Sequence, residues 1–229
     1  MKKRLVVLSG AGISAESGLA TFRGAGGLWE GYDIMEVASI EGWRKNPRLV
    51  IDFYNMRRNT ALAALPNRGH ETLAALESEF EVHIITQNVD LLHEKAGSLR
   101  VLHLHGRLDQ LRSSLDPSLI VEWKEDLAYG QKCPRGSQLR PNIVWFGEAV
   151  PAMNEAIRLA QLADIFVVVG TSLQVYPAAN LVHEIRPTIP AFLIDPEPVG
   201  TMGANWTTLA QPASEGIPVL REMLLESFH

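Results

Sequence analysis

A glycine-rich stretch at residues 10–29, GAGISAESGLATFRGAGGLW, constrains the fold of this chain more than any other part of its 229 residues. It follows the apolar run at residues 5–8, which has the composition of a buried parallel strand. Residues 10–15 fit the pattern G-x-G-x-x-G/A, in which glycines let the backbone approach a pyrophosphate at the start of a helix. The pattern therefore indicates a nucleotide-binding turn, although taken alone it is a weak signal.

The residues after this turn separate the chain from an ordinary dinucleotide-binding fold. That fold returns to a second strand that ends in an acid about twenty residues further on. Here the corresponding stretch, residues 22–27, reads FRGAGG, which cannot form a strand. We therefore predict a flexible loop that covers a bound nucleotide.

Composition excludes several classes of function. The net charge of −5 comes without basic clusters, which argues against binding of nucleic acid or of anionic membranes. The N-terminal apolar run is too short for a secretion signal or a membrane span, so we expect a cytoplasmic protein. The single cysteine, Cys133, excludes an internal disulfide and a zinc site built from several thiolates.

Apolar runs alternate with stretches of helical periodicity, which predicts an α/β fold: a Rossmann-like parallel sheet with helices on both faces. The expected strands are residues 5–8, 81–86, 99–103, 142–146, 164–170 and 191–195. Helices are expected at residues 47 to about 62, 70–78 and 214–225.

Two excursions from this sheet predict a small, discontinuous second domain within one catalytic unit of residues 1–229. Residues 23–68 offer helices without an intervening strand, and residues 107–141 are polar and irregular. The Rossmann-like part then comprises residues 1–22, 69–106 and 142–229.

Polar residues follow the expected strand at residues 81–86. Asn88 and Asp90 come where that strand ends and a helix begins, at the carboxyl edge where open α/β folds bind ligands. Either residue could instead be a simple N-cap of the helix.

Two histidines, His103 and His105, stand two residues apart and would share one side of a regular strand. A histidine just before Gly106 at a strand end suits a general base, because an imidazole with a pKa of about 6.5 is largely neutral at pH 7. The alternative is two hydrogen-bonded histidines without a catalytic role. No cluster of Cys, Asp or Glu stands nearby, which disfavours a metal.

Two further expected strands deliver polar residues to the same edge. Thr171 and Ser172 follow Gly170 and suit contacts to phosphate or ribose, unless they only form a tight turn. Asp195 could accept hydrogen bonds from ribose hydroxyls, or it could initiate the turn before Pro196.

Six segments in this order and spacing resemble the sirtuin family of NAD-dependent protein-lysine deacylases: GAGISAESG, TFRGAGGLW, TQNVDLLHEKAG, LHLHG, LRPNIVWFGE and GTSLQVYPAA. The resemblance extends from about Leu5 to Ala213, and the pattern is closest to the bacterial branch with class III character. It implies an enzyme that consumes NAD, removes acyl groups from lysines of proteins or peptides, and releases nicotinamide and O-acyl-ADP-ribose.

The resemblance also implies roles for individual residues. His105 matches the general base, and Asn88 and Asp90 match catalytic positions around the nicotinamide ribose. The implied NAD-binding residues are Gly10, Ala11, Gly12, Glu16, Phe22, Arg23, Trp29, Gln87, Asn88, Val89, Asp90, Gly170, Thr171, Ser172, Asp195, Glu197 and Ala213. Asp195 departs from the asparagine common at its position, and its charge would disfavour a nearby phosphate.

Tyr54 and Arg57 match the Tyr-x-x-Arg pair of class III sirtuins, which implies a pocket for a dicarboxylic acyl chain such as succinyl or malonyl. An arginine fork beside a phenol suits a distal carboxylate, whereas an arbitrary Tyr-x-x-Arg would be a solvated helix face. The resemblance places the substrate peptide between two strand-like segments, which implies contacts to Phe146, Gly147, Val175 and Tyr176.

The chain departs from the family at its structural zinc. Sirtuins usually carry two cysteine pairs, but here Cys133 is the one cysteine of the second pair and residues 111–116 read LRSSLD where the first pair would stand. We therefore predict no zinc and expect Trp123, Tyr129 and apolar neighbours to support the small domain by packing.

Two other functions use the same pocket. An NAD glycohydrolase or ADP-ribosyltransferase would consume NAD without lysine deacylation, and a non-catalytic sensor would only bind it. Asn88, Asp90 and His105 argue against a sensor, because a binder needs no base beside the ribose. The sequence leaves the protein targets and the oligomeric state open.

Overall fold

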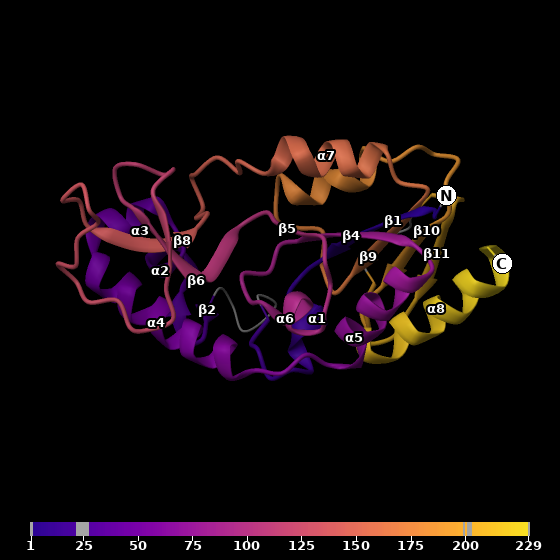
Figure 1. The fold of residues 1–229 in the computed structure, drawn as a ribbon, viewed down its shortest axis with the longest axis horizontal. Coiled ribbons are helices and arrows are strands. Elements are labelled where there is room, and N and C mark those ends of the chain that lie inside the picture. The colour runs from indigo at the N-terminus through magenta and orange to yellow at the C-terminus, as the bar shows by residue number, and fades with distance from the viewer. Residues whose placement is uncertain (1, 22–27, 199, 201–202, 229) are drawn as a thin grey trace.

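The computed structural model describes residues 2–21, 28–198, 200 and 203–228. Its main sheet has six strands: β1 (Arg4–Ser9), β4 (Glu81–Thr86), β5 (Val101–His103), β9 (Ile165–Val169), β10 (Ala191–Ile194) and β11 (Trp206–Leu209). They lie in the order β11-β10-β9-β1-β4-β5, and every pair is parallel (Figure 1). The α/β class and the parallel sheet predicted from the alternation of apolar runs are confirmed.

Helices cover both faces of this sheet. Successive residues of β1 point to opposite faces, so Leu5 and Val7 enter one core and Val6 and Leu8 the other. The first core contains α5 (Arg68–Ala75) and α8 (Ala213–Phe228). The second contains α7 (Met153–Gln161) and the 3-10 helix η2 (Ala178–His183). Because both faces are buried, the central strands carry uninterrupted apolar residues.

In the main sheet, the sequence analysis placed one strand wrongly and missed another. Residues 142–146 do not join the parallel sheet, since Leu139–Ile143 forms β8, which pairs antiparallel with β6 (Gly106–Ser113). The sixth parallel strand is β11 at the sheet edge. Its two central residues, Thr207 and Thr208, are exposed, so it lacks the apolar run by which a buried strand is recognised.

A second group of elements surrounds its own core. β6 is the central strand of a three-stranded sheet between β7 (Ile120–Glu122) and β8, so residues 107–141 are more regular than their composition suggested. A hairpin of β2 (Leu28–Trp29) and β3 (Tyr32–Asp33) adds two short strands within residues 23–68, where helices alone were expected. These elements lie to the left in Figure 1. The division of the chain into two domains stays a prediction.

Three helices complete this group: α2 (Ile34–Val37), α3 (Ile40–Lys45) and α4 (Pro47–Ala63). Asn46 caps α4 by accepting a hydrogen bond from the backbone of Leu49, and Pro47 occupies the first turn, where no donor is lost. The helix buries Val50, Phe53 and Tyr54 against β6 and β8. The helix predicted from residue 47 to about 62 is therefore confirmed.

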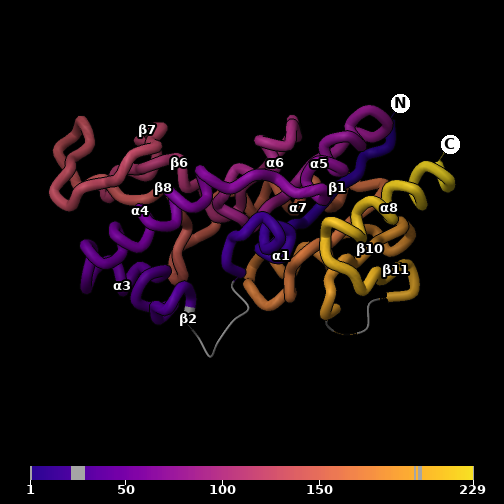
Figure 2. The backbone as a smooth tube through the Cα atoms, turned by 90° about the horizontal axis from the view of Figure 1, so that it is seen from below, coloured from indigo at the N-terminus to yellow at the C-terminus, as the bar shows by residue number. Residues whose placement is uncertain are grey.

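Short elements lie where the two groups meet. These are α1 (Gly12–Ala15) and α6 (Leu92–Lys95), which follow the carboxyl ends of β1 and β4. Figure 2 shows α1 between the main-sheet elements and the second group. The carboxyl edge of the sheet thus faces the junction, which is where open α/β folds bind ligands.

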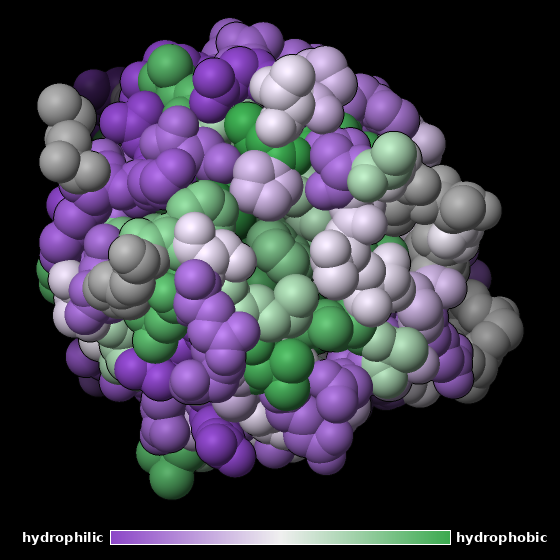
Figure 3. All heavy atoms as spheres, turned by 90° about the vertical axis from the view of Figure 1, so that its right-hand side faces the viewer, coloured by the Kyte–Doolittle hydropathy of each residue, from purple (hydrophilic) through white to green (hydrophobic). Residues whose placement is uncertain are grey.

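The opposite end of the molecule carries both termini. Figure 3 shows this end, where polar residues surround small apolar patches. In the described part of the chain, no helix combines the length and the apolar character needed to cross a membrane.

Candidate active site

The glycine turn after β1 packs directly against the end of β9. A Cβ atom on Gly12 would lie 2.6 Å from the Cα atom of Gly170, and one on Gly10 would lie 2.7 Å from the Gly170 carbonyl oxygen. The Gly12 backbone N–H donates to that oxygen at 2.8 Å. Because these glycines lack a Cβ atom, the ends of two neighbouring strands can come into contact. The sequence did not reveal this role.

Ser14 joins two of the predicted catalytic residues. Asn88 Nδ2 donates to Ser14 Oγ at 3.1 Å, and Ser14 Oγ donates to Asp90 Oδ2 at 3.0 Å. Asn88 Nδ2 also donates to the Gly10 carbonyl at 3.1 Å. All three polar side chains are buried, and burial raises the pKa of Asp90 although hydrogen bonds from the Leu92 backbone and Ser14 oppose the rise.

The capping alternative holds for one of these residues only. Asp90 Oδ1 accepts from the backbone of Leu92 at the start of α6, as a capping residue would. Asn88 does not cap the helix, since its side chain turns back to the glycine turn. Gln87 reaches across to β9 and donates from Nε2 to Thr171 Oγ1 at 3.1 Å. Hydrogen bonds thus connect the ends of β1, β4 and β9.

His105 is hydrogen-bonded on one ring nitrogen. Its Nδ1 lies 3.0 Å from the Gln87 carbonyl oxygen, which can only accept, so Nδ1 carries the proton of the neutral ring. Nε2 then keeps a lone pair and can act as a base. Burial lowers the pKa of His105, with the Gln87 hydrogen bond opposing, so the neutral form is favoured at pH 7.

His103 has partners on both ring nitrogens. Nδ1 lies 3.1 Å from the Asn88 carbonyl oxygen, and Nε2 lies 2.7 Å from Glu94 Oε1. His103 therefore has no free ring nitrogen and fits the alternative reading, a hydrogen-bonded histidine without a catalytic role. It ties α6 to the segment that carries Asn88.

Tyr54 and Arg57 lie together on α4 beneath the β2–β3 hairpin. Tyr54 is 1% exposed, and its phenol oxygen accepts from Trp145 Nε1 at 3.0 Å. Burial raises the pKa of Tyr54 to about 12. Because the indole N–H can only donate, the phenol proton is left to donate to another group.

The Arg57 guanidinium stacks 4.1 Å over the ring centroid of Trp29. Its NH1 lies 3.8 Å from Glu30 Oε1, and the side chain is 11% exposed. Burial lowers the pKa of Arg57, which the negative charges of Glu30 and Asp90 oppose. Within the described residues Arg57 makes no hydrogen bond, so its donors are available to a ligand. Trp29, predicted at the cofactor, stacks on Arg57, and its role at the cofactor stays a prediction.

The predicted peptide-binding segments are not strands in this structure. The backbone N–H of Phe146 donates to the Ala38 carbonyl, and its carbonyl accepts from the backbone of Ile40. Of the predicted pair Phe146 and Gly147, only Gly147 has a backbone N–H and C=O without a backbone partner among the described residues. Residues 173–176 form a bend and a turn before the cis peptide bond Tyr176–Pro177. The Val175 carbonyl accepts from the backbone of Ala179, and the Tyr176 side chain is exposed.

The residues predicted at the adenosine end are mostly engaged within the chain. Asp195 Oδ1 accepts from the backbone of Glu197 at 2.9 Å, which is the turn-forming contact of the alternative. Glu16 accepts from the backbone and hydroxyl of Ser214, which joins α1 to the start of α8 next to Ala213. Ser172 and Val89 are partly exposed at the strand ends. Phe22 and Arg23 lie outside the described residues.

A hydrogen-bonded cluster occupies the region where sirtuins usually bind zinc. Ser137 Oγ lies 2.7 Å from Ser113 Oγ and 3.1 Å from Cys133 Sγ. One thiol and two hydroxyls do not fit a tetrahedral thiolate site. Among the described residues no group of three or more His, Cys, Asp or Glu gathers in a way that could hold a metal.

Apolar packing accompanies this cluster. Cys133 packs with Ile51, Leu111, Leu127 and Leu139, and Trp123 contacts the same cluster. The expected role of Trp123 is therefore confirmed. Tyr129 is 51% exposed and stacks with Arg48 at the surface, so its expected packing role was wrong.

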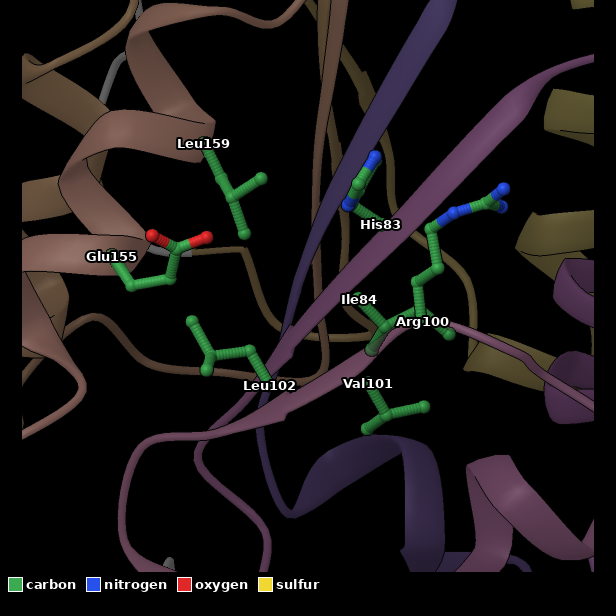
Figure 4. A pocket seen from close by; sticks show the side chains of 7 residues that line it. All are labelled: His83, Ile84, Arg100, Val101, Leu102, Glu155 and Leu159. Atoms are coloured by element: carbon green, nitrogen blue, oxygen red, sulfur yellow. The ribbon is translucent and has the colours of Figure 1, made fainter.

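A hollow away from these residues has no counterpart in the prediction. It measures about 160 Å³, lies between α7 and the β4–β5 edge, and is lined by His83, Ile84, Arg100, Val101, Leu102, Glu155 and Leu159 (Figure 4). It contains none of the predicted site residues.

Sequence reasoning missed Ser14, Glu30, Glu94 and Trp145. Ser14 and Trp145 stand inside segments that carried the resemblance, but nothing local shows which way a side chain points. Trp145 meets Tyr54 across 91 residues of sequence, and Ser14 meets Asp90 across 76. These partners become visible only in three dimensions.

A parallel sheet with polar residues at its carboxyl edge, and an imidazole with an available lone pair beside them, defines a nucleotide-binding α/β protein. The chain belongs to the Sir2 family, whose family model matches residues 10–177.

Relatives and solved structures agree with this membership. An NAD-dependent protein deacylase of Bacteroides thetaiotaomicron is 52% identical over 97% of this chain and 98% of its own length. One of Helicobacter pylori is 57% identical over 85% of each chain. A Sir2 homologue in complex with NAD is 36% identical, with a TM-score of 0.88, over 100% of this chain and 91% of its own.

Proposed function

We propose that this chain removes succinyl and malonyl groups from protein lysines in an NAD-dependent reaction, with acetyl groups as weaker substrates. The broader activity, NAD-dependent protein deacylation, is that of the Sir2 family and of relatives 52% and 57% identical to it. A Sir2 protein bound to an acetylated peptide is 28% identical over 99% of this chain, with a TM-score of 0.78, which supports acyl-lysine peptides as the substrate class.

The observation that carries the acyl preference is the paired donor set of Tyr54 and Arg57. The Trp145 indole N–H donates to the Tyr54 oxygen, so the phenol proton stays available to donate, and Arg57 has no hydrogen bond within the described residues. A distal carboxylate would accept from both groups and would supply the negative charge that a buried guanidinium needs. An acetyl group offers neither, which predicts weaker binding.

We place NAD at the junction between the strand ends, where open α/β folds bind ligands. Gly10, Gly12 and Gly170 carry no Cβ where the two backbones meet, and Asn88, Asp90 and Gln87 place polar atoms beside them. When bound there, NAD supplies a ribose carbon that accepts the acyl oxygen as nicotinamide leaves.

The residues of this chain then have separate tasks. Asn88 and Asp90 are held by Ser14 and hydrogen-bond the ribose, while His105 Nε2 takes a proton from a ribose hydroxyl. Burial of the site excludes water, which favours transfer of the acyl group to the sugar over hydrolysis of NAD. By the family resemblance, Gly170, Thr171 and Ser172 would contact the phosphates and Asp195 and Glu197 would lie at the adenosine end.

The zinc-free small domain belongs to this proposal. Ser113, Ser137 and Cys133 form a hydrogen-bonded connection between the end of β6 and the loop at residues 133–137, and the apolar cluster around Leu111 packs beside it. Neither requires a metal ion.

The test is turnover of matched acetyl-lysine and succinyl-lysine peptides with NAD, with products identified by mass. Succinyl-peptide kcat/KM is expected to exceed acetyl-peptide kcat/KM and to fall at least about 100-fold in R57M, because a charged hydrogen-bond pair is lost. Arg44→Met, which changes an exposed arginine of α3, is the control. An unchanged succinyl-to-acetyl ratio in R57M would refute the acyl preference, and NAD consumption without peptide would favour a glycohydrolase.

A further inference from the structure

The turn between β2 and β3 holds a glutamate in a conformation that glutamate rarely adopts. Glu30 and Gly31 have φ angles of 52° and 83°, and Trp29 pairs with Tyr32 on either side. Two positive φ angles in a two-residue hairpin turn favour Asn or Asp followed by Gly. A non-glycine residue held there indicates that its side chain has a purpose at that place.

Aromatic packing fixes the position of this turn. The rings of Trp29 and Tyr32 each lie 5.4 Å from the ring of Phe53 on α4, in edge-to-face geometry. Arg57 lies one helical turn further along α4, under the Trp29 ring. The hairpin therefore holds Glu30 above Arg57 before any substrate arrives.

Glu30 provides charge without occupying the donors of Arg57. At 3.8 Å from Arg57 NH1, its carboxylate lies within ion-pair distance but beyond hydrogen-bond distance. Within the described residues it is the one carboxylate at ion-pair distance from Arg57, and its side chain is 34% exposed. Tyr54 and Asp90 also face this guanidinium, and like Glu30 they raise the pKa of Arg57 against the effect of burial.

We propose that Glu30 is an internal counter-ion of Arg57 that sets how strongly the enzyme prefers acyl chains with a distal carboxylate. The proposal rests on the acyl pocket proposed above. Glu30 stabilises the guanidinium when the acyl group is neutral, and it repels the carboxylate of a succinyl group that binds the same guanidinium. It therefore weakens dicarboxylic substrates and leaves neutral acyl groups such as acetyl largely unaffected.

The experiment compares E30Q and E30N with the wild type on acetyl-, succinyl- and succinamyl-lysine peptides. Succinamyl has the size of succinyl but no charge. Asn is favoured in this turn, so E30N removes the charge and keeps the hairpin even if E30Q disturbs it. E30D, which keeps the charge, and Glu36→Gln, which removes an exposed charge on α2, are the controls.

Loss of the charge is expected to raise succinyl-peptide kcat/KM about three- to fivefold through KM, the size of effect expected for a partly exposed ion pair. The acetyl and succinamyl peptides should change less than about twofold, and the gain should disappear in the R57M background. E30D and the Glu36 variant should match the wild type.

Two outcomes are distinguishable. If succinyl turnover of the wild type does not depend on Arg57, the proposed acyl pocket is wrong and the role of Glu30 is wrong with it. If succinyl turnover depends on Arg57 but neither E30Q nor E30N raises it, or if both raise succinamyl turnover equally, the role of Glu30 alone is overturned.

Discussion

Replacing His70 by glutamine is expected to flatten the dependence of stability on pH in acid. His70 is fully buried on α5, and burial lowers its pKa from 6.5 to about 4. Its Nδ1 accepts from the backbone of Asn67 at 3.3 Å, and its Nε2 has no partner among the described residues. The ring is therefore held neutral in the folded protein.

The free energy of unfolding depends on pH because the folded and unfolded states bind the His70 proton at different pH. Between pH 6.5 and about 4 the unfolded chain protonates His70 and the folded chain does not, so the free energy of unfolding falls as the pH falls. Above pH 6.5 His70 is neutral in both states, so its full contribution to stability is present there. A difference of about 2.5 pH units at about 1.4 kcal/mol per unit predicts a loss of about 3 kcal/mol by pH 4.

Glutamine is the suitable replacement because it can accept the same backbone hydrogen bond at the third residue of a helix but does not titrate. Urea unfolding of both proteins at pH 7, 6, 5 and 4 measures the effect. The wild type should lose about 3 kcal/mol more than H70Q across this range. His183→Gln, at an exposed position, is the control. Parallel curves for the wild type and H70Q would refute the reasoning, since they would show that burial does not hold His70 neutral.

Other predictions concern the base, the glycine turn and the zinc-free cluster. Since burial lowers the pKa of His105, the acid limb of kcat/KM should fall below pH 6.5, and a limb above that pH would contradict its role as the neutral base. Gly12→Ala should weaken NAD binding and cost about 1–3 kcal/mol of stability, because its Cβ atom would lie 2.6 Å from the Gly170 backbone. Gly203→Ala is the control, and calorimetry that finds no change in NAD binding or stability for Gly12→Ala would refute this prediction. Ser137→Ala should cost about 1 kcal/mol in urea unfolding, equally with and without a chelator; stoichiometric zinc in the purified protein would contradict this account.

Part of the fold could be predicted from the sequence because the patterns that mark it lie within short segments of the chain. The apolar runs of β1, β4, β9 and β10 mark buried parallel strands, and Asn46 and Pro47 mark the start of α4. The sequence did not predict β11, because an edge strand needs no apolar run. It did not predict the antiparallel sheet, because the pairing of β6 with β8 joins segments distant along the chain. Motif order, likewise a property of the linear chain, was sufficient to identify the family.

The sequence by itself determined which residues are available: the glycine turn, the polar residues after each strand, the histidine pair, Tyr54 and Arg57 at helical spacing, and a single cysteine. Only the tertiary structure decided what each of them does. It gave His105 Nδ1 a carbonyl acceptor, which leaves Nε2 as the base, and gave His103 two partners. It also placed Trp145 on Tyr54 and Glu30 over Arg57. The physical reason is that residue types and spacings act along the chain, whereas protonation, hydrogen-bond direction and charge balance depend on neighbours that packing brings from elsewhere.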